Sequence, residues 1–235
     1  MITVKNLNAG YRRLQILFDV SASFQVGKIN VVVGPNGSGK STLLKSIFGL
    51  TSIYSGSVSF DSVELVGKSP HAIARLGIAY LPQMNKVFEN LTVEENLLMA
   101  GYTLEKSKLL KKIEEVSEIF SIIEKYRKTK AGLLSGGERQ MIATAMALIR
   151  EPRVMMFDEP TSELAPKMAK SVLEKIVELR DKMGMTIILV EQNAKKALEI
   201  GDAAYLLVGG RVAFEGSCQE LLTHPQLSTL YLGLR

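Results

Sequence analysis

The chain has 235 residues, of which 46% are hydrophobic and 23% are charged, and this ordinary globular composition excludes disordered, collagen-like and low-complexity proteins. Its 29 basic and 24 acidic residues give a formal charge of +5, which would permit nucleic acid or an anionic membrane surface as a partner. Eight basic and five acidic residues lie between Glu105 and Lys130, so most of the excess belongs to the solvated face of one helical segment, and no nucleic-acid partner is expected.

The first third of the chain is predicted to form short strands around one helix. The strands that the apolar pattern indicates cover residues 2–7, 17–24, 29–33, 57–60 and 77–81. Gly10 and Gly27 are expected to break this run of strands. The strand at 29–33 is apolar on both faces, which is typical of a central parallel strand. A helix is expected from about residue 40 to residue 48, and the strand at 77–81 is followed by Pro82 and Gln83.

From residue 92 to about residue 148 the pattern changes to helices. Apolar side chains recur every three or four positions, at Leu109, Ile113, Val116, Phe120 and Ile123. Strands then return at 154–157 and 186–190, with a helix over 167–183 between them; a helix around 196–198 and a hairpin over 205–214, turning at 209–210, follow. The sequence therefore predicts a parallel α/β core that is interrupted by a helical insertion.

The residue inventory also limits the site chemistry and the compartment. Cys218, His71 and His224 cannot form a disulfide, a zinc cluster or a thiol redox pair, and Cys218 is expected to be a core residue in a reducing compartment. No apolar stretch approaches the roughly 20 residues that cross a bilayer. Residues 1–7 do not have the pattern of a secretory signal, so a cytoplasmic location is predicted.

A phosphate-binding loop is predicted between the strand at 29–33 and the helix after it. The pattern G-x-x-x-x-G-K-[ST] and the next residue are formed by Gly34, Pro35, Asn36, Gly37, Ser38, Gly39, Lys40, Ser41 and Thr42. The glycines allow backbone N–H groups and the positive helix end to surround a β-phosphate. Lys40 would neutralise β- and γ-phosphate oxygens, Ser41 would bind Mg²⁺, and Thr42 would reach the α-phosphate.

Two adjacent carboxylates follow a buried strand. Asp158 and Glu159 come after the apolar run at 154–157, which places Asp158 at the carboxyl edge of a parallel sheet, beside the phosphate loop. Asp158 is expected to hold Mg²⁺ through its water shell, and Glu159 to polarise the attacking water. Taken alone, the pair is equally consistent with acidic residues at a helix N-terminus. Together with the loop it predicts hydrolysis of a nucleotide phosphate.

A second anion site is predicted at residues 134–140, directly before the apolar helix at 141–149. Ser135, Gly136 and Gly137 would present a hydroxyl and N–H groups at the positive end of that helix, and a glycine-bearing helix start is the alternative. Leu-Ser-Gly-Gly with a phosphate loop upstream and Asp-Glu downstream is a specific combination. On these motifs the sequence resembles the ATP-binding-cassette (ABC) ATPases over essentially its whole length.

The resemblance implies the fold and further site residues. It implies an α/β P-loop NTPase (RecA-like) with a parallel-sheet core, an N-terminal antiparallel β-subdomain and an inserted α-helical subdomain. The single domain, 1–235, would divide into a core at 1–83 and 153–235 and a helical subdomain at 84–152. Tyr11 looks like the aromatic residue that stacks on adenine, with a core tyrosine as the alternative. Gln83 resembles the glutamine that touches Mg²⁺ and the attacking water.

The resemblance also implies partners. In this family two copies, or a copy and a paralogue, pair head to tail, so Ser135 and Gly137 would contact the γ-phosphate of the ATP bound to Lys40 of the other subunit. ATP would hold the pair together and hydrolysis would release it. The energy would pass to separate transmembrane permease subunits, which would hold the chain at the inner face of the membrane.

Short features make the match closest to the ATPase subunits of branched-chain amino-acid importers. These are Leu-Ala-Pro at 164–166, Val-Glu-Gln-Asn at 190–193, and a tail with His-Pro at 224–225 and Tyr-Leu-Gly at 231–233. Urea and amide importers share much of this pattern, and the lipopolysaccharide-export ATPase has a similar tail. A soluble ATPase of iron–sulfur assembly is a further alternative, whereas a nucleotide-binding module without hydrolysis conflicts with Lys40, Asp158 and Glu159.

Several positions depart from the family pattern. Ala165 stands where most members carry aspartate, and Glu163 stands where a small residue is usual, which puts communication between the two sites of a dimer in doubt. Gln192 replaces the switch histidine, so its contact with the γ-phosphate would come from a neutral amide. Met146 replaces a common arginine, which affects surface packing more than catalysis.

Overall fold

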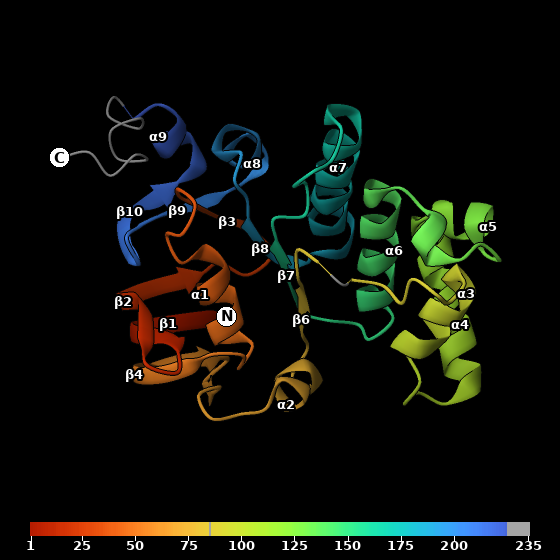
Figure 1. Cartoon of the computed structure of the whole chain (residues 1–235), viewed down its shortest axis with the longest axis horizontal. Coiled ribbons are helices and arrows are strands. Elements are labelled where there is room, and N and C mark those ends of the chain that lie inside the picture. The colour runs from red at the N-terminus through yellow and green to blue at the C-terminus, as the bar shows by residue number, and fades with distance from the viewer. Residues whose placement is uncertain (85, 225–235) are drawn as a thin grey trace.

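The computed structural model describes residues 1–84 and 86–224, so the tail features predicted at 225 and at 231–233 lie outside the described residues. Figure 1 shows two sheets on one side and a group of helices on the other. The first sheet is antiparallel, and its strands in spatial order are β2 (Leu14–Phe24), β1 (Ile2–Tyr11), β4 (Ser52–Phe60) and β5 (Val63–Glu64).

The second sheet is largely parallel. Its strands in spatial order are β10 (Arg211–Ser217), β9 (Ala203–Val208), β3 (Ile29–Val33), β8 (Thr186–Val190), β7 (Val154–Asp158) and β6 (Ile78–Leu81). Only β10 runs antiparallel to its neighbour. Every residue of β3, β7 and β8 is buried, because both faces of these strands are covered. The predicted α/β class, with an antiparallel N-terminal sheet, is confirmed.

In chain order the helices are α1 (Lys40–Ile47), α2 (Pro70–Arg75), α3 (Val93–Ala100), α4 (Lys106–Ile119), α5 (Ile122–Tyr126), α6 (Gly136–Leu148), α7 (Pro166–Met183), α8 (Ala194–Ile200) and α9 (Cys218–Leu222), with a short 3₁₀ turn at Ala131–Leu133. The helices predicted at 40–48, over 92–149, at 167–183 and around 196–198 are present, and the structure adds two helices that were not predicted, α2 and α9. In Figure 1, α3 to α6 gather beyond the edge of the sheet that β6 forms, and α7 lies between them and the strands. The predicted subdomain boundaries at residues 84 and 152 stay a prediction.

The core is divided by the parallel sheet. Val31 and Val33 belong to a cluster with α6, α7 and α8, whereas Val32 belongs to a cluster with α1 and the first sheet. The same alternation holds along β8, because successive side chains of a strand point to opposite faces. The carboxyl ends of the parallel strands therefore lie between two firmly packed layers, and the loops that leave them are held at one edge.

Several predicted boundaries are wrong. The helix predicted at 141–149 begins at Gly136, as α6. Gly10 does not break the first strand, because β1 continues to Tyr11 and Gly10 pairs with Gln15 of β2. A Cβ atom at residue 10 would lie 2.0 Å from the carbonyl oxygen of Leu14, so the glycine permits a close approach of two strands. The strand predicted at 57–60 begins at Ser52, because its exposed, serine-rich half pairs with β1 through the backbone and shows no apolar pattern.

Cys218 is buried, as the sequence predicts. Among the residues that the structure describes, no helix combines the length and the apolar character that crossing a bilayer requires.

Candidate active site

The loop between β3 and α1 curls around a hollow at the carboxyl edge of the sheet. Gly34 has a φ of 153°, and a Cβ atom there would lie 2.1 Å from the carbonyl oxygen of Leu207. Gly39 is the N-cap residue of α1 and has a φ of 100°. It makes no side-chain cap, so it leaves the first N–H groups of the helix without that partner. The buried hydroxyl of Ser38 has no hydrogen-bond partner within the described residues. This loop therefore offers donors to an anion.

Lys40 is buried inside the same loop. Its Nζ atom donates to the carbonyl oxygens of Gly34 at 2.9 Å and of Pro35 at 3.1 Å, and lies 3.8 Å from Oε1 of Glu159. Burial lowers the pKa of Lys40, against the attraction of three carboxylates, those of Glu159, Asp158 and Glu191. A cation held by two carbonyl oxygens in a partly desolvated place is prepared to exchange them for stronger anionic acceptors.

Asp158 ends β7 and is buried, with both oxygens occupied. Its Oδ1 accepts a hydrogen bond from the Ser41 hydroxyl at 2.7 Å, and its Oδ2 accepts one from the Tyr80 hydroxyl at 2.8 Å. Burial, and after it the negative charge of Asp158, raise the pKa of Tyr80. The predicted pair of Ser41 and Asp158 therefore lies together, although the two residues are 117 positions apart in the chain.

Glu159 follows in a strained backbone conformation. Its φ is 50°, in the left-handed region, and its N–H donates to the carbonyl oxygen of Val190 at 2.9 Å. The Gln83 amide donates to Oε2 of Glu159 at 3.3 Å and to the Ser162 hydroxyl at 3.2 Å. Gln83, from the segment after β6, is thus connected to the carboxylate that the sequence predicts as the general base.

An open cavity of about 440 Å³ joins most of the predicted residues. It is lined by the loop at residues 36–42 together with Ile16, Gln83, Glu159 and Gln192. Asp158 lies behind this cavity and meets it through Ser41. Tyr11 does not line the cavity; it is 40% exposed at the end of β1. The structure thus brings together the phosphate loop, Gln83, Glu159 and Gln192, and Tyr11 is not among the residues that line this cavity.

The Ser-Gly-Gly segment lies outside that cavity. Ser135 caps α6, its hydroxyl donating to Oε2 of Glu138 at 2.8 Å and accepting from the Glu138 N–H at 3.4 Å. Gly137 is packed so closely that a Cβ atom would lie 2.6 Å from Cε of Met168. The glycine-bearing helix start that the sequence left open is therefore present, with a complete capping box.

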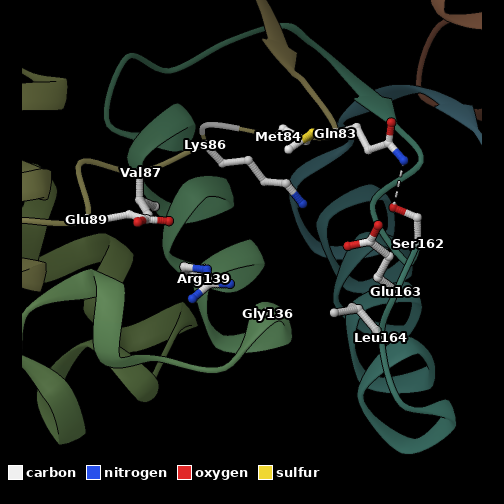
Figure 2. A pocket seen from close by; sticks show the side chains of 10 residues that line it. All are labelled: Gln83, Met84, Lys86, Val87, Glu89, Gly136, Arg139, Ser162, Glu163 and Leu164. Carbon is white, nitrogen blue, oxygen red and sulfur yellow. Dashed lines mark hydrogen bonds between the residues drawn. The ribbon is translucent and has the colours of Figure 1, made fainter.

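A second cavity, of about 340 Å³, separates the helical group from the loop after β7. Figure 2 shows Lys86 and Arg139 on one side of it and Ser162, Glu163 and Leu164 on the other. Gln83 lines both cavities, so it connects the phosphate loop with this cleft. Burial, followed by repulsion from Arg139, lowers the pKa of Lys86.

Two residues close to the site were not found by sequence reasoning. Glu191 is buried and accepts from the Thr161 N–H at 2.9 Å, and burial raises its pKa. Its place next to Gln192 was visible in the sequence, but its burial was not. Tyr80 could be recognised only from the register of β6 and β7, which no motif encodes.

Known proteins resemble this chain in sequence and in fold. The sequence model of the family described as "ABC transporter" matches residues 17–162. A probable branched-chain amino acid transport ATP-binding protein, LivF, of Archaeoglobus fulgidus is 53% identical, and the match covers 100% of this chain and 99% of the relative. A high-affinity branched-chain amino acid transport ATP-binding protein, BraG, of Pseudomonas aeruginosa is 39% identical over 99% of this chain and 100% of the relative.

A solved structure extends the likeness to three dimensions. It is the dimeric structure of a post-hydrolysis state of an ATP-binding cassette bound to ADP and phosphate, and it superposes with a TM-score of 0.81 at 25% identity. The superposition covers 93% of this chain and 99% of that one.

Proposed function

This chain belongs to the ABC transporter family of ATP-binding proteins, and on that premise we propose that it is the ATP-hydrolysing subunit of an importer for branched-chain amino acids. The observation that carries the proposal is the cavity where the phosphate loop meets Gln83, Glu159 and Gln192. Two relatives named for branched-chain amino acid transport, similar over nearly their full length, support the solute.

The phosphate loop binds the nucleotide. Backbone N–H groups at the start of α1 and the Ser38 hydroxyl donate to phosphate oxygens, and Thr42 reaches the α-phosphate. Lys40 releases the carbonyl oxygens of Gly34 and Pro35 and turns to the β- and γ-phosphates, which are stronger acceptors because they are charged. Tyr11 stacks on adenine, where its exposed ring is accessible to a ligand.

The residues beside the loop fit Mg²⁺. Ser41 Oγ and Asp158 Oδ1 lie 2.7 Å apart and Gln83 adds an amide, so the available donors are the hard oxygens that Mg²⁺ prefers. Such sites usually combine one or two carboxylates with substrate phosphates and water. The ion would be held by Ser41, Asp158 and Gln83, and when bound it neutralises the charge that develops on the phosphates.

Glu159 is the general base. Its carboxylate accepts the proton of the attacking water, and Gln83, which already donates to that carboxylate, keeps it directed into the cavity. Gln192, which lines the same cavity, contacts the γ-phosphate, and Lys40 neutralises the oxygens that gain charge. The products are ADP and phosphate.

A second subunit completes the site. Ser135, Gly136 and Gly137 are outside the cavity that holds Lys40 of the same chain, so they serve a nucleotide only if another subunit brings one to them. We propose a head-to-tail dimer with a second copy or a paralogue, and the dimeric cassette bound to ADP and phosphate supports it. The chain itself joins the inner face of the membrane through permease subunits, near Gln83 and the helical group.

The test is transport by a reconstituted complex. The tagged chain is purified with its membrane partners, and these are placed in vesicles with ATP and labelled leucine, isoleucine or valine. We expect ATP-dependent uptake that stops with Glu159→Gln, whereas Glu174→Gln, an exposed carboxylate of α7, leaves it unchanged. Uptake of urea or amides in place of these amino acids would refute the solute, and a complex without ATP-dependent transport would refute the coupling role.

A further inference from the structure

Tyr80 lies in the strand that leads to Gln83. Residues 78–81 of β6 pair with residues 154–157 of β7, and Tyr80 stands opposite Met156. Asp158 is two positions further along β7, so its side chain points to the same face as that of Met156 and is the diagonal neighbour of Tyr80. This register explains how the Tyr80 hydroxyl reaches Oδ2 of Asp158 at 2.8 Å.

The ring of Tyr80 is fixed on its other side by the helix after the phosphate loop. Its centroid lies 5.5 Å from that of Phe48, the residue that ends α1, with the rings inclined at 41°. The tyrosine therefore contacts two elements, the end of α1 and the end of β7, while its own strand continues into Gln83. A ring held this way directs its hydroxyl to one place.

The two oxygens of Asp158 receive different donors. Ser41, on α1, donates to Oδ1, and Tyr80 donates to Oδ2. A tyrosine hydroxyl, with an ordinary pKa of about 10, is protonated at neutral pH and can donate this bond at all times. A carboxylate with a donor fixed at Oδ2 cannot rotate about its Cβ–Cγ bond without breaking that bond, so Oδ1 stays directed at Ser41.

We infer that Tyr80 is a positioning residue that holds the Asp158 carboxylate in the orientation in which Oδ1 and Ser41 together face the metal. The inference rests on the proposed Mg²⁺ site. Tyr80 touches neither nucleotide nor ion; it acts through Asp158. Groups that orient metal-binding side chains typically change metal affinity by about 10- to 100-fold when they are removed.

The experiment measures binding at equilibrium, without turnover. The dissociation constant of ADP is determined by calorimetry, once with EDTA and once with saturating Mg²⁺. The constant in EDTA divided by the constant in Mg²⁺ reports how strongly Mg²⁺ is held with the nucleotide. Tyr80→Phe keeps the ring on Phe48 and removes only the hydroxyl. We expect the ratio to fall about tenfold in Tyr80→Phe, with the ADP affinity in EDTA unchanged.

Tyr205→Phe is the matched control. Its hydroxyl donates to the carbonyl oxygen of Ser23 at 2.7 Å, and Tyr205 does not line the phosphate-loop cavity. It should lower stability like Tyr80→Phe but keep the parental ratio, whereas Asp158→Asn should abolish the Mg²⁺ effect. An unchanged or larger ratio in Tyr80→Phe, with the parent showing a Mg²⁺ effect, overturns the role of Tyr80 alone. A parent without any Mg²⁺ effect overturns the proposed metal site and the role of Tyr80 with it.

Discussion

The phosphate loop and the Ser-Gly-Gly segment are both expected to bind phosphate, but they are built in opposite ways. Beside the loop, Glu159 has a positive φ of 50°, and the buried Ser38 hydroxyl has no partner in the described part of the chain. Lys40 and Glu191 are buried, and burial shifts the pKa of each toward its neutral form. The Ser-Gly-Gly segment instead starts a regularly capped helix, in which Ser135 and Glu138 bond reciprocally.

The two halves of the proposed site differ in how they are stabilised when no ligand is bound. The phosphate loop holds polar groups in places that are unfavourable without a ligand, and such strain concentrates at functional sites. The Ser-Gly-Gly segment gains stability from its cap, and its Ser135 is exposed while Gly137 is buried. We therefore expect the phosphate loop to bind a nucleotide, and the Ser-Gly-Gly segment to contact a nucleotide that another subunit binds.

The largest expected effect is on the phosphate-loop side. Glu159→Gln should lower ATP hydrolysis by about 10²- to 10⁴-fold, because the amide is nearly isosteric but cannot accept the proton of water. ATP affinity should remain, and a dimer should accumulate with MgATP. Phosphate release and size-exclusion chromatography measure both. Hydrolysis near the parental rate, with no dimer, would remove Glu159 from its role as general base.

On the Ser-Gly-Gly side, Ser135→Arg tests whether the segment is offered to another subunit. The arginine would occupy the place of the partner's γ-phosphate and block dimerisation, while ATP binding to the single chain remains. Lys40→Ala damages the other half. In a mixed dimer one composite site carries both lesions and the other carries none, so mixing two inactive variants should restore part of the ATPase activity. A mixture as inactive as either variant contradicts head-to-tail pairing.

Gln192 lines the phosphate-loop cavity together with Gln83 and Glu159. Gln192→Ala should lower hydrolysis by about 10- to 100-fold, since one or two hydrogen bonds to a charged group are worth about 1.5–3 kcal/mol. Gln192→His should recover much of the rate and add an inflection near pH 6–7, because histidine titrates at about 6.5. Rate–pH profiles decide this: identical profiles for the parent and Gln192→His, or an undiminished rate in Gln192→Ala, would exclude Gln192 from the reaction.

The sequence predicted what depends on local pattern. The sequence predicts the ends of the strands at 29–33 and 186–190 correctly, because both runs are largely apolar and are followed by Gly34 and Glu191. The sequence predicts a break at Gly10, and this prediction is wrong. The glycine permits a close approach between β1 and β2, which depends on the partner strand and is not visible in a local pattern. The Tyr80–Asp158 bond depends on register, and the burial of Glu191 on the packing of several loops, so neither could be read from one sequence.

The cap of the Ser-Gly-Gly helix gives a smaller effect. Ser135→Ala removes the acceptor of the Glu138 N–H, and the free energy of unfolding should fall by about 1 kcal/mol. Ser217 caps α9 with the same kind of box, so Ser217→Ala should cost a similar amount. Denaturant titrations measure both. Only Ser135→Ala should also weaken hydrolysis, and equal activity in the two variants would reduce Ser135 to a helix cap.

The smallest expected effect compares the two halves through pH. Burial raises the pKa of Glu191 in the folded protein. Its protonated form therefore contributes stability that is complete below the unfolded pKa and is lost as pH rises through the folded pKa. Relative to the parent, Glu191→Gln should gain stability as pH rises through that window and stay level above it.

Glu138 should show the opposite sign. Burial alone would raise its pKa, but the bonds that Ser135 donates, a bond from Tyr126 and the charge of Lys125 together outweigh burial and lower it. The carboxylate therefore contributes stability above the unfolded pKa, which is lost as pH falls through the folded pKa. Glu138→Gln should be less stable than the parent at neutral pH and approach it in acid. Unfolding titrations from about pH 3 to about pH 8 cover the windows of both carboxyl groups and give both differences, each against the same parent. For each variant, the difference in unfolding free energy from the parent is plotted against pH. Slopes of the same sign for Glu191→Gln and Glu138→Gln would contradict the opposite pKa shifts of the two carboxyl groups.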